Sequence, residues 1–150
     1  MKVKALRWVE DRDKKFEDMH LLRVEMKDLP MNMEFRGRFN VERGEEIEIM
    51  PLAIALSMEV LGEDYPAEDT IIPGGVFSIN TQTGIGEDAT ASITGEVTKV
   101  EESDEEGRRY FTLSCQDMEF YAIIDERITE AIEVRTGDTV TGVFWMRGEF

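Results

Sequence analysis

Four segments decide the fold of this chain: ITGEVTKVE (93–101), RRYFTLSC (108–115), MEFYAII (118–124) and TVTGVFWMRG (139–148). Val, Ile, Thr, Tyr, Phe and Trp dominate them, and such side chains suit the half-buried surface of a β-sheet. In the last three segments apolar side chains recur at every second position, which places them on one face of a strand. The side chains on these apolar faces are Phe111, Leu113, Cys115, Met118, Phe120, Ala122, Ile124, Val140, Phe144 and Met146.

The connections between these segments are typical of tight turns. The pair Gln116-Asp117 predicts a short hairpin, and Gly137 can adopt the positive φ that a turn before the last strand needs. The polar sequence EESDEEG (101–107) predicts the turn between the first two strands. The sequence ITEAIEV (128–134) predicts a short helical segment ahead of the last strand.

This order of elements resembles the second half of an oligonucleotide/oligosaccharide-binding (OB) barrel. The resemblance rests on a long first strand containing Gly95, a charged hairpin, two further strands, a short helical segment and a final strand. It covers about a third of the chain and implies a small antiparallel barrel, mainly β with minor α. It implies strand pairing more than function, because the same barrel hosts many activities. The resemblance departs in charge, since nucleic-acid-binding members have a basic groove and acids stand here instead: Glu119, Glu130, Glu133 and Asp138.

The rest of the chain is expected to belong to the same domain. No linker rich in Pro or Ser divides the sequence. We therefore expect one domain over residues 1–150, in which the strands and loops of residues 1–92 pack on the OB-like unit of residues 93–150.

The most apolar run, IEIMPLAIALSMEVL (47–61), has two interpretations. As a helix it would begin near Pro51 and end at Gly62, with Ala, Leu and Met as good helix formers. As a strand, its large apolar side chains from Met50 to Val60 alternate with small or polar ones without a break. Unbroken alternation favours the strand.

The net charge of −16 excludes one class of partner. Residues 44–98 contain 11 Asp and Glu but no Lys or Arg. A nucleic-acid-binding protein needs basic side chains along the phosphate path, so we expect no nucleic-acid partner. The acidity has two readings, a surface that keeps the protein in solution or a field that attracts a basic protein partner.

The sequence favours a protein of the cytoplasm. No apolar run reaches the roughly 18 residues that a membrane-spanning helix needs, so we expect no membrane partner. The N-terminal residues become acidic too early for a secretory signal. Cys115 is the only cysteine, which excludes an intramolecular disulfide and suits a buried thiol in a reducing compartment.

The chain lacks most of the groups that catalysis would use. His20 is the only histidine, and a zinc site would need several His or Cys ligands. The phosphate-binding pattern G-x-x-x-x-G-K-[ST] does not occur. We therefore expect no enzymatic activity, no cofactor and no metal site. An enzyme built on carboxylates is a less favoured alternative, because 33 acids in 150 residues produce chance pairs in any cleft.

Aromatic side chains on the polar strand faces are the best candidate binding residues. Tyr110, Tyr121 and Trp145 lie opposite the apolar side chains of their strands, and Arg108 and Arg147 share the face of Tyr110 and Trp145. In one interpretation the N-terminal strands cover these side chains. In the other they form an exposed stacking surface for a ligand or partner.

The favoured function is therefore a non-catalytic, acidic β-barrel that docks a protein partner. The alternative is a binding module for a small molecule or carbohydrate that uses the exposed aromatic side chains.

Overall fold

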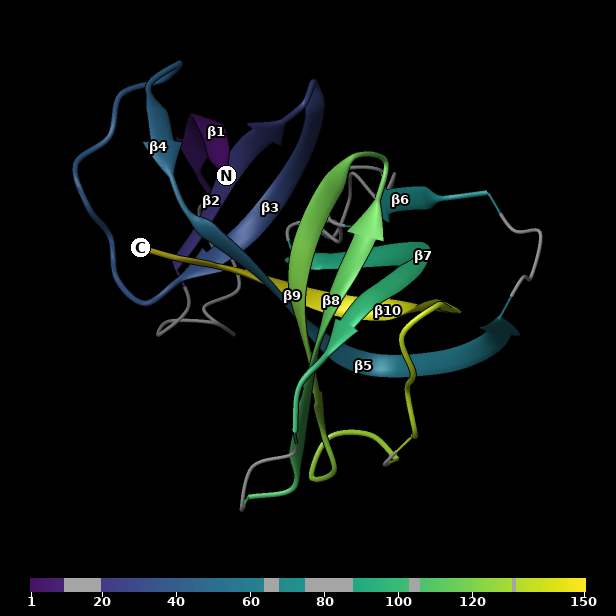
Figure 1. Ribbon diagram of the computed structural model, residues 1–150. Coiled ribbons are helices and arrows are strands. Elements are labelled where there is room, and N and C mark those ends of the chain that lie inside the picture. The colour runs from purple at the N-terminus through teal and green to yellow at the C-terminus, as the bar shows by residue number, and fades with distance from the viewer. Residues whose placement is uncertain (10–19, 64–67, 75–87, 103–105, 131) are drawn as a thin grey trace, which may run out of the picture.

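The computed structural model describes residues 1–9, 20–63, 68–74, 88–102, 106–130 and 132–150. Ten strands within these ranges form one sheet, which confirms the mainly β fold class (Figure 1). The strands are β1 (Lys2–Trp8), β2 (His20–Met26), β3 (Leu29–Phe35), β4 (Glu46–Glu48), β5 (Met50–Glu63), β6 (Thr70–Pro73), β7 (Thr90–Val100), β8 (Arg108–Cys115), β9 (Met118–Asp125) and β10 (Asp138–Glu149).

Five of these strands close into a small barrel. They follow the order β10–β5–β9–β8–β7, and β7 pairs again with β10 to complete the circle. All of these pairs are antiparallel except β5–β9. This closed circle of strands confirms the expected small β-barrel. Its fifth strand is β5, because the alternating run that had two interpretations forms a strand and not a helix.

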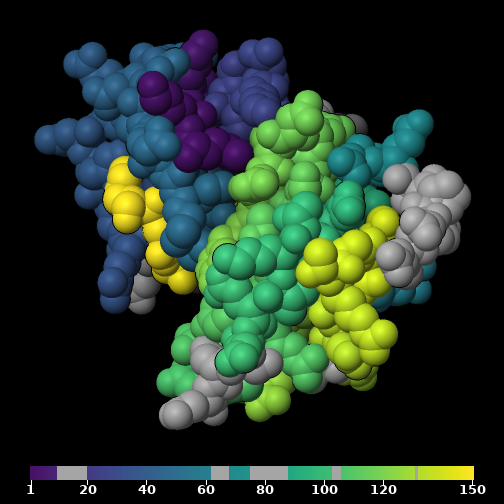
Figure 2. Space-filling model, in the orientation of Figure 1, coloured from purple at the N-terminus to yellow at the C-terminus, as the bar shows by residue number. Residues whose placement is uncertain are grey.

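The remaining strands extend the sheet beyond the barrel. Strands β4, β1, β2 and β3, here called the N-terminal sheet, follow one another and reach β10 through a parallel pairing of Glu34 with Arg147. The N-terminal sheet, in purple and blue, therefore lies beside the barrel rather than over its green strands (Figure 2). Strand β6 pairs with β7 on the same edge that β8 uses further along.

Two hairpins with two-residue turns tie these parts together. Gln116 and Asp117 have φ of 50° and 61°, and Lys27 and Asp28 have φ of 45° and 67°. Positive φ at both central residues is the signature of a type I′ turn, whose twist matches that of paired strands. The Lys27 ammonium donates a hydrogen bond to the Asp117 carbonyl, 2.5 Å away, so the two turns meet.

The expected helical segment over residues 128–134 is wrong where the structure describes it. Only one turn forms, in which the amides of Ile128 and Thr129 both donate to the Asp125 carbonyl. The Asp125 carboxylate accepts from the backbone and side chain of Arg127, which completes the turn. Residues 132–135 have no regular secondary structure, and the Ile132 carbonyl accepts from the Arg109 side chain instead of from a helical amide.

The buried face of β5 changes along its length. A β-bulge at Leu56 inserts one extra residue between Ser57, opposite Val143, and Ala55, opposite Phe144. Such a bulge shifts the side-chain alternation by one position. Consequently Met58 faces the core on one side of the bulge, whereas Ala53 and Ala55 face it on the other.

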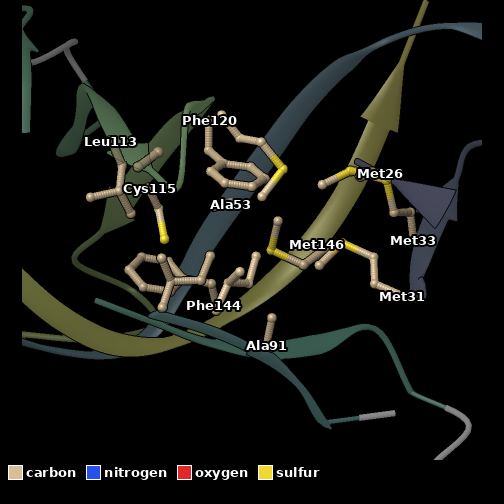
Figure 3. Packing of buried hydrophobic residues seen from close by; sticks show 14 of the residues in the cluster. Met26, Met31, Met33, Ala53, Ala91, Leu113, Cys115, Phe120, Phe144 and Met146 are labelled. Atoms are coloured by element: carbon tan, nitrogen blue, oxygen red, sulfur yellow. The ribbon is translucent and has the colours of Figure 1, made fainter. Parts of the chain in front are cut away.

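One continuous hydrophobic core joins the barrel to the N-terminal sheet. All ten side chains expected on the apolar strand faces are buried in it, at 2% exposure or less. Figure 3 shows Met146 of β10 between the barrel residues Phe120 and Phe144 on one side and the N-terminal methionines on the other. Methionine is flexible and fills irregular spaces, which suits the junction of the barrel with the N-terminal sheet. The methionines contributed by the N-terminal sheet are Met26, Met31 and Met33.

Candidate functional site

The hairpin of β8 and β9 brings two predicted site residues together. Its register places Tyr110 opposite Ile123 and Tyr121 opposite Thr112, so the tyrosines are diagonal neighbours on the outside of the barrel. Their rings stack with centroids 5.6 Å apart and planes inclined by 17°. Both side chains are half-buried. We call the outer surface formed by Tyr110, Thr112, Tyr121 and Ile123 the tyrosine face.

A carboxylate fixes one of these rings. The Tyr121 hydroxyl donates a hydrogen bond to the Glu101 carboxylate, with the oxygens 2.5 Å apart. This bond, with smaller contributions from burial and from the negative charge of Glu101, raises the pKa of Tyr121 to about 12. The backbone amide of Glu101 also donates to the Tyr110 carbonyl. Glu101 thus anchors the aromatic pair at the end of β7.

Apolar side chains continue the tyrosine face toward β5. The parallel pairing of β9 with β5 places Leu52 beside Tyr121 and Ile54 beside Ile123. Ile54 and Ile123 are half-buried. Leu52 is only 5% exposed but belongs to neither core cluster, because it points away from the barrel interior. An apolar strip therefore crosses the outside of three neighbouring strands.

The charged side chains around the tyrosine face are mostly acidic. Glu101 and Glu102, at the end of β7, and Glu119, on β9, are exposed. Exposed Lys99 lies opposite Thr112 and is the nearest basic residue on β7. A second basic group, Arg108, forms an ion pair of 2.7 Å with Glu106. The carboxylates outnumber the cations at the β7 end of this surface.

Trp145 and Arg147 lie in a different environment. The indole Nε1 of Trp145 donates to the Glu34 carboxylate at 3.0 Å, and Arg147 Nε lies 3.3 Å from the other oxygen of that carboxylate. The Trp145 ring packs on a second small cluster of Val9, Leu21 and Ala89. The N-terminal strands thus cover Trp145 in part, as one of the two interpretations expected.

The five predicted site residues consequently form two groups. Tyr110, Tyr121 and Arg108 lie on the β8–β9 hairpin, whose strands are coloured green in Figure 2. Trp145 and Arg147 lie where β10 meets the N-terminal sheet, held by Glu34.

The groups with catalytic potential are placed apart from this surface. Burial, with a smaller effect from Asp69, raises the pKa of Cys115 to about 11, so the thiol is not a nucleophile at neutral pH. Its sulfur donates to the Thr70 carbonyl at 3.3 Å. His20 is half-buried at the start of β2. Among the described residues, no three His, Cys, Asp or Glu side chains gather to hold a metal ion.

No protein-family model, curated protein or solved structure matches this chain. The described residues include no helix with the length and apolar character needed to cross a membrane.

Sequence reasoning missed the residues that complete the site. The position of Ile123 could have been predicted from the sequence, because a two-residue turn at Gln116-Asp117 fixes its pairing with Tyr110. The positions of Ile54 and Glu101 could not have been predicted, because they depend on the parallel β5–β9 pairing and on a hydrogen bond from Tyr121 on β9 to the residue after β7.

Proposed function

We propose that this protein is a non-catalytic binding module that docks a basic segment of a protein partner on the tyrosine face. The observation that carries the proposal is a stacked tyrosine pair, half-exposed and anchored by Glu101, on a chain of net charge −16.

The chemistry of this surface suits Lys and Arg side chains. A guanidinium or ammonium group is attracted to the face of a tyrosine ring, by about 0.5–1 kcal/mol at an exposed site. Glu101 and Glu102 supply carboxylates at the end of the same surface. The field of the whole acidic protein would also speed the approach of a basic partner.

The same charge argues against two other partners. Nucleic acid would be repelled by the carboxylates that border the tyrosine pair. A second copy of this chain would carry the same net charge of −16, so mutual repulsion disfavours self-association through the acidic surface.

A peptide titration tests the proposal. The probe is a hexa-arginine peptide, with a hexa-glutamate peptide as the control, and binding is followed by calorimetry. We expect the arginine peptide alone to bind, and the double variant Tyr110→Ala/Tyr121→Ala to weaken binding at least fivefold while the fold is retained. The matched control is Phe150→Ala, which removes an aromatic ring that is 79% exposed elsewhere.

Two results would contradict this proposal. One is equal binding by the tyrosine double variant and the parent protein. The other is binding that does not weaken between 50 and 200 mM salt, since attraction between exposed charges is screened as ionic strength rises.

A module for carbohydrates or small molecules is the second candidate, because half-exposed aromatic rings also bind sugars. The geometry favours it less, since β5 and β9 lie between Trp145 on β10 and Tyr110 on β8. Trp145, which this candidate would also use, is bonded to Glu34. Quenching of Trp145 fluorescence by a neutral oligosaccharide, lost in Trp145→Ala, would favour this candidate over the peptide partner.

The strand pairing supports a proposal about the type of barrel. Strands β7, β8 and β9 form a meander, β10 pairs with β7, and β5 lies between β10 and β9 with a parallel pairing to β9. We propose that this is an OB-type barrel in which the strand that ordinarily comes last is supplied from earlier in the chain. A cytoplasmic location fits the single buried thiol and stays a proposal.

A further inference from the structure

The apolar strip and the acidic end of the tyrosine face lie in a fixed order across the barrel. Pairing partners place Ile54, Ile123 and Tyr110 side by side on β5, β9 and β8. The Tyr110 carbonyl accepts from the backbone amide of Glu101, the residue that follows the end of β7. The surface therefore changes from apolar to aromatic to acidic along a line that crosses the strands.

From this order we infer that the partner's basic segment is an extended chain with one apolar side chain and two basic side chains at alternate positions. This inference rests on the proposed function. It adds a pattern of side chains to the general preference for positive charge.

The dimensions of a sheet set the spacing of that pattern. Neighbouring strands lie about 4.8 Å apart, so the line from between β5 and β9 to β7 is about 12 Å long. An extended chain advances about 3.3 Å per residue and turns every second side chain to the same side. An apolar side chain on Ile54 and Ile123 would then place the next same-side residue over the tyrosine pair and the one after it at Glu101.

The charges near Glu101 favour a basic residue of the partner, not an acidic one, at that end of the line. Glu101 and Glu102 are exposed there, and Arg108 is engaged by Glu106. Lys99 is the one exposed cation on β7 near this end, opposite Thr112. Its single charge leaves the carboxylates in excess, so charge complementarity selects a cationic segment.

The test uses short peptides of matched composition. One carries Leu, Arg and Arg at alternate positions (GLSRSRG), and it is also made in the reverse direction (GRSRSLG). The second places the three side chains together (GSLRRSG), and the third replaces Leu by Ser (GSSRSRG). Affinities are measured by calorimetry on the full chain. We expect one direction of the alternating peptide to bind about tenfold more tightly than both other peptides, because burying one aliphatic side chain is worth about that factor.

The variant Ile123→Thr locates the contact. This substitution keeps a β-branched side chain but replaces the ethyl group of isoleucine with a hydroxyl group. We expect it to lose the tenfold preference for Leu while its affinity for GSSRSRG stays the same, a coupling that a double-mutant cycle measures directly. Ile54→Thr is the second variant if the first does not fold. Val143→Thr is the matched control, on the outside of β10 opposite Ser57 and Ser92.

The possible results separate the two levels of the proposal. If GSSRSRG binds, depends on Tyr110 and Tyr121, and shows no preference for Leu, the pattern is overturned and the proposed function stands. If the preference exists but Ile123→Thr and Ile54→Thr leave it intact, the position of the apolar contact is overturned. If no peptide binds, the proposed function fails with it.

Discussion

Tyr121 is held by one side-chain hydrogen bond, and that bond has a measurable signature. The neutral phenol donates to a carboxylate, so loss of its proton would set two negative charges side by side. The bond therefore raises the pKa of Tyr121 to about 12. Because the folded-state pKa lies above the ordinary value of 10, the stabilisation is present below about pH 10 and is lost as pH rises through about 12.

Replacing Glu101 by Gln should return the pKa of Tyr121 toward 10, since the charged acceptor is removed. Titration followed by NMR of the tyrosine ring carbons measures this directly. Glu119→Gln, which removes a nearby exposed carboxylate without touching that hydroxyl bond, should leave the value high. An unchanged pKa in Glu101→Gln would mean that Glu101 does not hold the ring.

Cys115 should be inert in the folded protein. Its side chain is fully buried, and burial raises its pKa to about 11, so almost no thiolate is available at pH 8. We expect no reaction with a thiol reagent over an hour in buffer, and one equivalent of reaction in denaturant. Fast reaction without denaturant would show that the strand end near Thr70 opens readily.

At the level of single elements, β10 approaches β5 closely at Gly142. A Cβ on Gly142 would approach the Ser57 carbonyl oxygen to 2.3 Å, and backbone at that position cannot move without disturbing the β5–β10 ladder. Gly142→Ala should therefore destabilise the protein by about 1–3 kcal/mol, the range typical of overpacking.

Urea unfolding followed by circular dichroism provides the measurement. Gly37→Ala is the control, because nothing lies within 4 Å of a Cβ added there. Equal midpoints for the two variants would contradict the close approach of the strands.

Period-two patterns predicted individual strands well and their partners poorly. The strand over residues 50–61 was predicted, but its buried face was not, because the bulge at Leu56 arises from how β5 pairs with β10. Likewise the predicted helical segment near Ile128 is limited to one turn by the Asp125 carboxylate and by a distant arginine, Arg109. Local sequence carries little information on either interaction.

The same limit applies to the candidate site: features set by local sequence were predictable, and features set by distant contacts were not. The neighbouring positions of Tyr110 and Tyr121 follow from alternation and one short turn, which are both local. The separation of Trp145 from them follows from β5, which lies between β10 and β9, and the partner of Trp145, Glu34, is 111 residues away in sequence. Contacts of that kind could not be read from a single segment.

At the level of the whole molecule, the shared core predicts that the barrel and the N-terminal sheet unfold together. The two tryptophans report on the two parts, since Trp8 lies on β1 and Trp145 on β10. Trp8→Phe and Trp145→Phe each leave one reporter. We expect the fluorescence transitions of both variants in urea to coincide with the loss of circular dichroism, once corrected for each variant's own stability.

A separate, earlier transition seen only through Trp8 would contradict a single cooperative unit. Met146→Ala sharpens the comparison, because Met146 lies between the two parts. It should lower the stability seen by both reporters, by about 2–5 kcal/mol.

The central place of β10 also constrains how the chain folds as it is made. That strand pairs with β5, β7 and β3, and it follows all of them in the sequence. A nascent chain on the ribosome therefore cannot close its barrel until the residues up to Glu149 have left the exit tunnel. Until then the apolar sides of β5 and β7 stay exposed without their shared partner strand. Synthesis must therefore be faster than aggregation of these strands, or a chaperone must cover them.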